Sequence, residues 1–164
     1  MFDFLKKNKE IEVDDSNVIK APLEGKVITM KEVNDPIFAE ELLGKGVAIQ
    51  PIKGRVVAPA NAEVTTIADT KHAIGLTLAS GVELLIHVGL DTVKLNGEYF
   101  TPCVKIGDKV KVGTVLMEFN LEQLKKKGFD TTTPIIISNT ADYSEIRPIL
   151  GKVRELDKII ELSR

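Results

Sequence analysis

Short apolar and β-branched runs recur along the chain from Val18 onward, separated by glycine, proline and asparagine. Runs of this length at fairly regular spacing are typical of strands in a β-sandwich or barrel. The pattern therefore predicts an all-β fold, an antiparallel β-sandwich. The runs assigned to strands are residues 27–29, 47–49, 55–57, 64–67, 70–76, 83–89, 109–112, 115–119, 134–137, 145–147 and 159–161.

One or two short helices interrupt this pattern. The first, residues 36–43, follows Asp35 as N-cap and ends before Gly44. The second, residues 121–127, follows Asn120 as N-cap and ends in three lysines. Acceptor side chains at the start of a helix and glycine or cations at its end are the usual helix boundaries.

A short motif occurs twice, 37 residues apart, as APLEGKV at residues 21–27 and APANAEV at residues 58–64. Two copies of a strand-turn-strand unit could stack as the halves of one sandwich. Similar turn chemistry in two unrelated places would also produce so short a match. Internal duplication is therefore a hypothesis for the structure to test.

Only two histidines occur in the 164 residues, and they lie on two strand-like arms joined by a turn-like segment, residues 79–82. The pattern predicts a β-hairpin. A two-residue loop at positions 80 and 81 would place His87 opposite Ile74, on the face that His72 shares, because side chains alternate with period two. A three-residue loop would put the two rings on opposite faces.

Paired imidazoles suit phosphoryl chemistry. A neutral histidine has an unprotonated nitrogen that can attack phosphorus, and a second imidazole can donate a hydrogen bond to the phosphoryl oxygens. Gly89 would let its carbonyl approach the His87 ring and fix the reactive tautomer. The alternatives are that each histidine is only a packed side chain, or that Asp91 caps a turn.

A zinc site is a further alternative for the two histidines. A structural zinc site needs four ligands, and the chain offers neither a third histidine nor a second cysteine. Asp91 is a candidate third ligand. We therefore expect no intrinsic metal, although His72 and His87 could bind one if a partner completed the site.

Charge and composition limit the partners. The 22 basic and 24 acidic residues are spread along the chain and give a net charge of −2, so we expect no nucleic-acid partner. No apolar stretch approaches the ~20 residues of a membrane span, and no signal peptide begins the chain. These features favour a cytoplasmic protein.

The first residues and the single cysteine have simple interpretations. Residues 1–17 are predicted to form a flexible tail, and residues 1–9 could make at most a peripheral membrane contact because their basic amphipathic stretch is short. Cys103 follows a proline among apolar residues and is predicted to be a buried small hydrophobe.

Residues 81–98, GVELLIHVGLDTVKLNGE, resemble the signature of the glucose-class enzyme IIA component of the bacterial phosphoenolpyruvate-dependent sugar phosphotransferase system. The resemblance implies a β-sandwich, here predicted as a barrel-sandwich hybrid, with a single enzyme IIA domain over residues 18–164. Tyr99 stands where the family commonly has glycine. Four further blocks follow the family's order and approximate spacing, at residues 35–40, 43–51, 70–75 and 133–139.

The resemblance also implies a function, that of a phosphotransferase which needs no cofactor. Such a relay accepts a phosphoryl group from the phosphocarrier HPr on a histidine and passes it to a cysteine on the IIB domain of a sugar permease. By motif position His87 would be phosphorylated on Nε2 and His72 would stabilise the phosphoryl group. Thr70 would orient His72, and Asp91 would lie beside the reactive ring.

Partner binding follows from the same resemblance. An apolar rim would dock both HPr and IIB, and regulated transporters or kinases are further expected partners of the unphosphorylated form. The start at Met1 favours a stand-alone protein, although a domain cut from a permease would look similar, and the sugar stays open. The rim residues are Ile37, Phe38, Val88 and Val93.

Two rival interpretations come from other classes. A biotinyl or lipoyl carrier is suggested by glycine-containing turns at residues 21–27 and 106–113, but such carriers present a lysine at a hairpin tip and residues 79–81 contain none. A zinc peptidase would need an HxH pair and a distant HxxxD motif, which the chain lacks.

Overall fold

The computed structural model describes residues 17–164. The predicted tail of residues 1–17, apart from Asn17, and its expected membrane contact through residues 1–9 lie outside these described residues. None of the helices in the described part is long and apolar enough to span a membrane.

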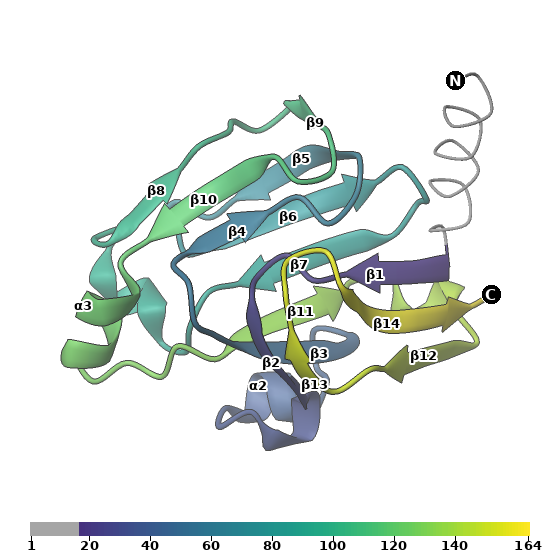
Figure 1. Cartoon of the computed structure of the whole chain (residues 1–164), viewed down its shortest axis with the longest axis horizontal. Helices are drawn as coiled ribbons and strands as arrows, with labels where there is room; N and C mark the ends of the chain where they lie inside the picture. The colour runs from purple at the N-terminus through teal and green to yellow at the C-terminus, as the bar shows by residue number, and fades with distance from the viewer. Residues whose placement is uncertain (1–16) are drawn as a thin grey trace.

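Three antiparallel sheets make up the structure (Figure 1). The large sheet has eight strands in the order β13 (Gly151–Val153), β2 (Gly25–Thr29), β3 (Lys45–Pro51), β11 (Thr133–Ile137), β7 (Glu83–His87), β6 (Ala73–Leu78), β5 (Ala62–Ile67) and β9 (Lys109–Val110). One small sheet has the order β1 (Val18–Lys20), β14 (Lys158–Ser163), β12 (Glu145–Pro148), and the other β4 (Arg55–Val57), β10 (Val115–Phe119), β8 (Phe100–Pro102).

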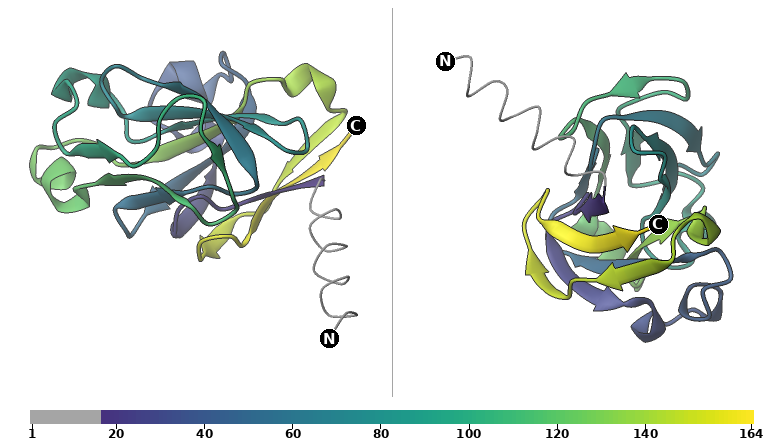
Figure 2. Two further views of the ribbon diagram at one scale, coloured as in Figure 1. Left: turned by 90° about the horizontal axis from the view of Figure 1, so that it is seen from above. Right: turned by 90° about the vertical axis from the view of Figure 1, so that its right-hand side faces the viewer.

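Residues of the large sheet and of the two small sheets form the main core. The three views in Figures 1 and 2 show how the sheets are arranged. Alternate residues of the large sheet, such as Ile49, Ile74 and Ile86, point into the main core and are fully buried. Ile19 of β1 and Leu116 of β10 meet them from the small sheets. This arrangement confirms the predicted all-β antiparallel fold.

Short helices connect the strands. Helix α2 (Pro36–Ala39) is capped by Asp35, whose Oδ1 accepts a hydrogen bond from the Ile37 amide at 3.0 Å. It is shorter than the predicted helix of residues 36–43 because Glu41 adopts a left-handed φ of 58°. The other helices are η2 (Met30–Glu32), η3 (Thr92–Leu95), α3 (Leu121–Lys126) and η4 (Thr140–Asp142).

The hydrogen-bond pattern supports the predicted duplication. Ala21 exchanges backbone hydrogen bonds with Leu156 and Asp157, and Ala58, 37 positions later, does the same with Gly113 and Thr114. The strands therefore correspond as β1 to β4, β2 to β5, β13 to β9 and β14 to β10.

The two halves are related by a two-fold axis within the large sheet. At its centre β7 and β11 pair with each other, with Ile86 opposite Ile135. We call residues 18–51 together with 133–163 the first half, and residues 55–119 the second half. The second half is thus inserted between β3 and β11 of the first.

Candidate active site

The two histidines lie where strands β6 and β7 meet at one end of the large sheet. His87 is the last residue of β7, and His72 directly precedes β6. The ring centroids are 4.7 Å apart at an interplanar angle of 80°, so one ring presents its edge to the other. The predicted meeting of the two rings is confirmed.

The predicted register is wrong. The hairpin loop has three residues, Ala79 to Gly81, and His87 lies opposite Ala73 rather than Ile74. The rings still meet because His72 lies outside the strand ladder, after Lys71 with its left-handed φ of 64°. Period-two alternation applies only within an extended strand.

The backbone determines which nitrogen of His87 is free. Its Nδ1 lies 2.8 Å from the carbonyl oxygen of Gly89. A carbonyl can only accept, so neutral His87 carries its proton on Nδ1 and presents an unprotonated Nε2. Gly89 itself has φ 77°, and a Cβ there would lie 2.6 Å from Cγ2 of Thr92, so glycine is required.

His72 is the more enclosed ring, with 6% of its surface exposed. Its Nδ1 lies 2.8 Å from Oγ1 of Thr70, which places Thr70 where the resemblance implied. The ring of Phe100 packs behind it at 6.5 Å between centroids. A hydroxyl that donates to Nδ1 leaves the proton of neutral His72 on Nε2.

Phe38 packs inward, contrary to its expected place on an exposed rim. Its side chain is 5% exposed, and its ring lies 4.9 Å from that of His87. Val88 is also no rim residue, because it is fully buried in the main core. Ile37 and Val93 are 49% and 50% exposed and remain available to a partner.

The surroundings keep both histidines neutral. Burial lowers the pKa of His72 below its ordinary value of 6.5. Burial is also the main cause that lowers the pKa of His87, and the neighbouring His72 adds to it. The hydrogen bond to Gly89 and the charge of Asp35 act in the opposite direction on His87.

The matching family model covers residues 17–143 and describes the EIIA 1 component of the phosphoenolpyruvate-dependent sugar phosphotransferase system. The chain belongs to this EIIA family. Its members relay a phosphoryl group through a phosphohistidine and work with HPr and a IIB domain. The implied family and phosphotransferase activity are confirmed.

Relatives of this EIIA chain occur both alone and in larger proteins. It is 46% identical to the glucose-specific EIIA component of Oceanobacillus iheyensis, over 95% of this chain and 93% of the relative. It is 48% identical to the β-glucoside-specific EIIBCA component of Bacillus subtilis, over 89% of this chain but only 24% of the relative.

A solved structure agrees with the fold. The glucose permease IIA from Mycoplasma capricolum superposes with a TM-score of 0.80 at 36% identity, over 87% of this chain and 93% of that one. The EIIA fold of this chain is therefore supported by structure as well as by sequence.

The acidic residues Asp91 and Asp35 differ in their relation to His87. Asp91 is exposed and adopts a left-handed φ of 59° before η3, and its side chain makes no capping hydrogen bond. Asp35, considered only as a helix cap, is the carboxylate whose charge acts on His87. Asp35 lies three residues before Phe38 in the sequence. No local sequence pattern connects this segment with His87, so the sequence alone could not identify the effect of Asp35 on the His87 ring.

The prediction for Cys103 is wrong. Cys103 is exposed rather than buried, because it follows the last residue of β8 and its Sγ lies beside the carbonyl of Thr101. Within residues 17–164 no cluster of three or more histidine, cysteine or acidic side chains could hold a metal ion.

Proposed function

We propose that Nε2 of His87 is the phosphoryl acceptor of this EIIA protein, with phospho-HPr as donor and a IIB cysteine as recipient. The observation that carries the proposal is the 2.8 Å contact between Nδ1 and the Gly89 carbonyl. It leaves the Nε2 lone pair free next to a second imidazole.

Acceptance is a single displacement at phosphorus. The Nε2 lone pair forms the new N–P bond while the N–P bond of the donor breaks, and its electron pair returns to the donor nitrogen. Positive charge develops on the His87 ring, and the Gly89 carbonyl stabilises it through the Nδ1 proton. In the onward step a cysteine thiolate attacks phosphorus, and the electron pair returns to Nε2.

His72 stabilises the transferred group. Oγ1 of Thr70 lies 2.8 Å from Nδ1 of His72. In the tautomer with the proton on Nε2, the Thr70 hydroxyl donates to Nδ1 and the Nε2 proton is available to the phosphoryl oxygens. The edge-to-face arrangement at 4.7 Å keeps this ring beside the reactive one rather than stacked over it. Because the pKa of His72 is lowered, this donor is a neutral imidazole at neutral pH.

Docking involves the exposed apolar side chains of the site. Ile37 on α2 and Val93 on η3 are about half exposed. Asp91 is exposed at the start of η3 and adds a negative charge there. Phe38 supports the reactive ring from within the protein instead of touching a partner.

The test combines two substitutions with HPr and IIB as reagents. His87→Gln should abolish acid-labile phosphate incorporation from phospho-HPr, because it removes the attacking nitrogen. His72→Gln should still become phosphorylated but should transfer to IIB about 10²-fold more slowly, the effect of one lost donor to the transferred group. Stoichiometric phosphorylation of His87→Gln would show that another residue is the acceptor.

The sugar specificity is tested with recipients rather than with this chain. The relatives are named for glucose or for β-glucosides. Transfer rates from the phosphorylated protein to a panel of purified IIB domains would rank these two classes. Equal rates to both would show that this chain does not discriminate between them.

A further inference from the structure

Thr92 is one of four buried polar residues in the described chain, and its side chain is fully buried. It directly follows Asp91 at the start of η3, five residues after His87 in the sequence. We propose that Thr92 is a positioning residue, which holds the Gly89 carbonyl against His87 and so keeps the ring in its reactive tautomer. This inference rests on the proposed role of His87.

The two branches of the Thr92 side chain fix the same peptide. Oγ1 donates a hydrogen bond to the Val88 carbonyl at 2.6 Å. Cγ2 lies against Gly89, only 2.6 Å from where a Cβ would be. The peptide plane between Val88 and Gly89 is therefore held at the Val88 carbonyl oxygen by a hydrogen bond and at the Gly89 Cα by packing.

The neighbouring peptide planes are anchored too. The Val88 amide donates to the His72 carbonyl at 2.8 Å, and the Leu90 amide donates to the Asp130 carbonyl at 2.9 Å. The Gly89 oxygen belongs to the plane that contains the Leu90 amide. The direction of the Gly89 carbonyl therefore depends on the φ and ψ torsions of Gly89. Thr92 holds the peptide plane on the N-terminal side of Gly89, the plane that it shares with Val88.

Glycine makes this support necessary. With no side chain, Gly89 can rotate at little cost once one of its two flanking planes is released. A rotated carbonyl would no longer accept from Nδ1 of His87. The proton could then move to Nε2, and a ring protonated there has no lone pair for phosphorus.

The experiment compares matched variants by two readouts. Long-range ¹H–¹⁵N NMR reports the tautomer of His87, and rapid mixing with phospho-HPr reports the acceptance rate. Thr92→Val keeps the shape but removes the donor, so we expect a mixture of tautomers and acceptance slowed by about tenfold, the size of one lost hydrogen bond. Thr92→Ser keeps the donor and should retain the Nδ1–H form.

Thr140→Val is the control for losing a threonine hydroxyl. Oγ1 of Thr140 donates to the Ile137 carbonyl at 2.7 Å, at the end of β11 away from the histidines. It should leave the tautomer and the acceptance rate unchanged. If Thr92→Val fails to fold, Thr92→Ala makes the same comparison.

The outcomes separate this inference from the acceptor assignment. A pure Nδ1–H tautomer with wild-type acceptance in a folded Thr92→Val or Thr92→Ala protein overturns the positioning role. A shifted tautomer supports it, even if His87→Gln were to show that His87 is not the acceptor. Slow acceptance with an unshifted tautomer also counts against it, because the proposed effect acts through the ring proton.

Discussion

The two halves of the molecule share one strand scaffold but differ in what covers the outer face of the large sheet. In the first half, residues 30–44 connect β2 to β3 and include η2 and α2. In the second half, residues 68–72 connect the corresponding strands β5 and β6. The longer connection lies over its own half as a cover, while the shorter one leaves the equivalent surface open.

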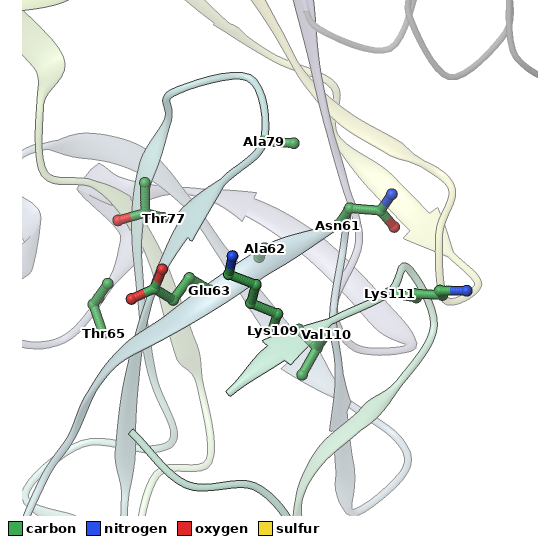
Figure 3. A pocket seen from close by; sticks show the side chains of 9 residues that line it. All are labelled: Asn61, Ala62, Glu63, Thr65, Thr77, Ala79, Lys109, Val110 and Lys111. Carbon is green, nitrogen blue, oxygen red and sulfur yellow. The ribbon is translucent and has the colours of Figure 1, made fainter. Parts of the chain in front are cut away.

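The outer face of each half matches its surroundings. Under the cover, Ile28, Ala48 and Ile136 form a second apolar cluster with Met30 and Phe38. On the open half the corresponding face is polar, and Glu63 lies between Thr77 and Lys109 across the strands. These side chains line an open pocket of about 580 Å³. Figure 3 shows how they lie on the strands.

The candidate site lies at the boundary between the covered and the open face. His87 pairs with Ala73 in the second half, as its counterpart Ile136 pairs with Gly46 in the first. Ile136 is buried under the cover, whereas His87 is partly exposed at its edge. The second half thus supplies His87, the proposed nucleophile, and the cover of the first half supplies Phe38, whose ring packs beside it.

Duplication of the strand scaffold alone does not produce the site. Strand β3 of the first half corresponds to β6 of the second with an offset of 27 residues, so the counterpart of His72 is Lys45. The counterpart of His87 is Ile136, and neither histidine is therefore repeated in the first half. The asymmetry of one connection gives the His87 ring an apolar neighbour, Phe38, on one side and solvent on the other. Such a ring is neutral at physiological pH and still reachable by a partner.

The largest expected effect comes from breaking the cover. Phe38→Ala removes a buried aromatic side chain between the cover and His87 and should destabilise the protein by about 3 to 5 kcal/mol. The pKa of His87 should rise because its ring becomes more hydrated. Urea unfolding and an NMR titration of His87 measure the two effects.

The adjacent residue provides the control for Phe38. Ile37→Ala truncates a side chain that is 49% exposed, so its stability should change little while its affinity for HPr falls. Wild-type stability in Phe38→Ala together with weakened HPr binding would restore the rim role that the sequence suggested. The two variants therefore test which of these neighbours faces the core.

A smaller effect on stability is expected from substitutions at two corresponding positions in the halves that both have positive φ. Gly44 and Lys71 are counterparts, with φ values of 134° and 64°. Gly44→Ala should cost about 2 to 3 kcal/mol, because its Cβ would lie 2.4 Å from the Ile137 carbonyl oxygen. Lys71→Gly removes the backbone strain of a left-handed non-glycine residue but raises the conformational entropy of the unfolded chain. These two effects oppose each other, so the free energy of unfolding should change by no more than about 1 kcal/mol.

Thermal or urea unfolding of both single variants decides this comparison. Equal destabilisation by Gly44→Ala and Lys71→Gly would mean that the two connections have the same backbone requirement. Phosphoryl acceptance by Lys71→Gly provides a second reading, since His72 follows directly. Unchanged acceptance would show that the strained residue is not needed to place the ring.

The fold was predictable where hydrophobic alternation decides it. The strand runs, the Asp35 cap and the 37-residue repeat are local signals that the structure bears out. The hairpin register was predicted wrongly. Gly81 at the third loop position, with φ 96°, is typical of three-residue loops and was the signal for the correct register. A one-residue error of this kind changes the face of every side chain on an arm.

The sequence allowed us to predict the chemical groups of the site but not the side chains that pack around them. The motif around His87 led to Gly89 and Thr70, which are its sequence neighbours or near neighbours of His72. The inward packing of Phe38 depends on the contact between the cover of the first half and His87 of the second half, which no local pattern encodes. Tyr99, at φ 75°, adopts a left-handed conformation that favours glycine, and its side chain gave no signal of this in the sequence.

The smallest expected effect is a pH dependence that belongs to the histidine pair alone. Burial lowers the pKa of both rings, so the folded protein binds fewer protons than the unfolded chain near pH 6. Stability should therefore fall as the pH drops below about 6.5 and level off once it lies below both lowered pKa values.

Removing His72 separates the two causes that lower the pKa of His87. His72→Gln eliminates the repulsion from a second imidazolium, so the pKa of His87 should rise, yet stay below 6.5 because burial is the larger cause. The pH-dependent loss of stability should shrink, since only one depressed group remains. An NMR titration of His87 and urea unfolding at several pH values between 5 and 8 measure both changes. A pKa of His87 that is unchanged or lower in His72→Gln would mean that the rings do not interact electrostatically.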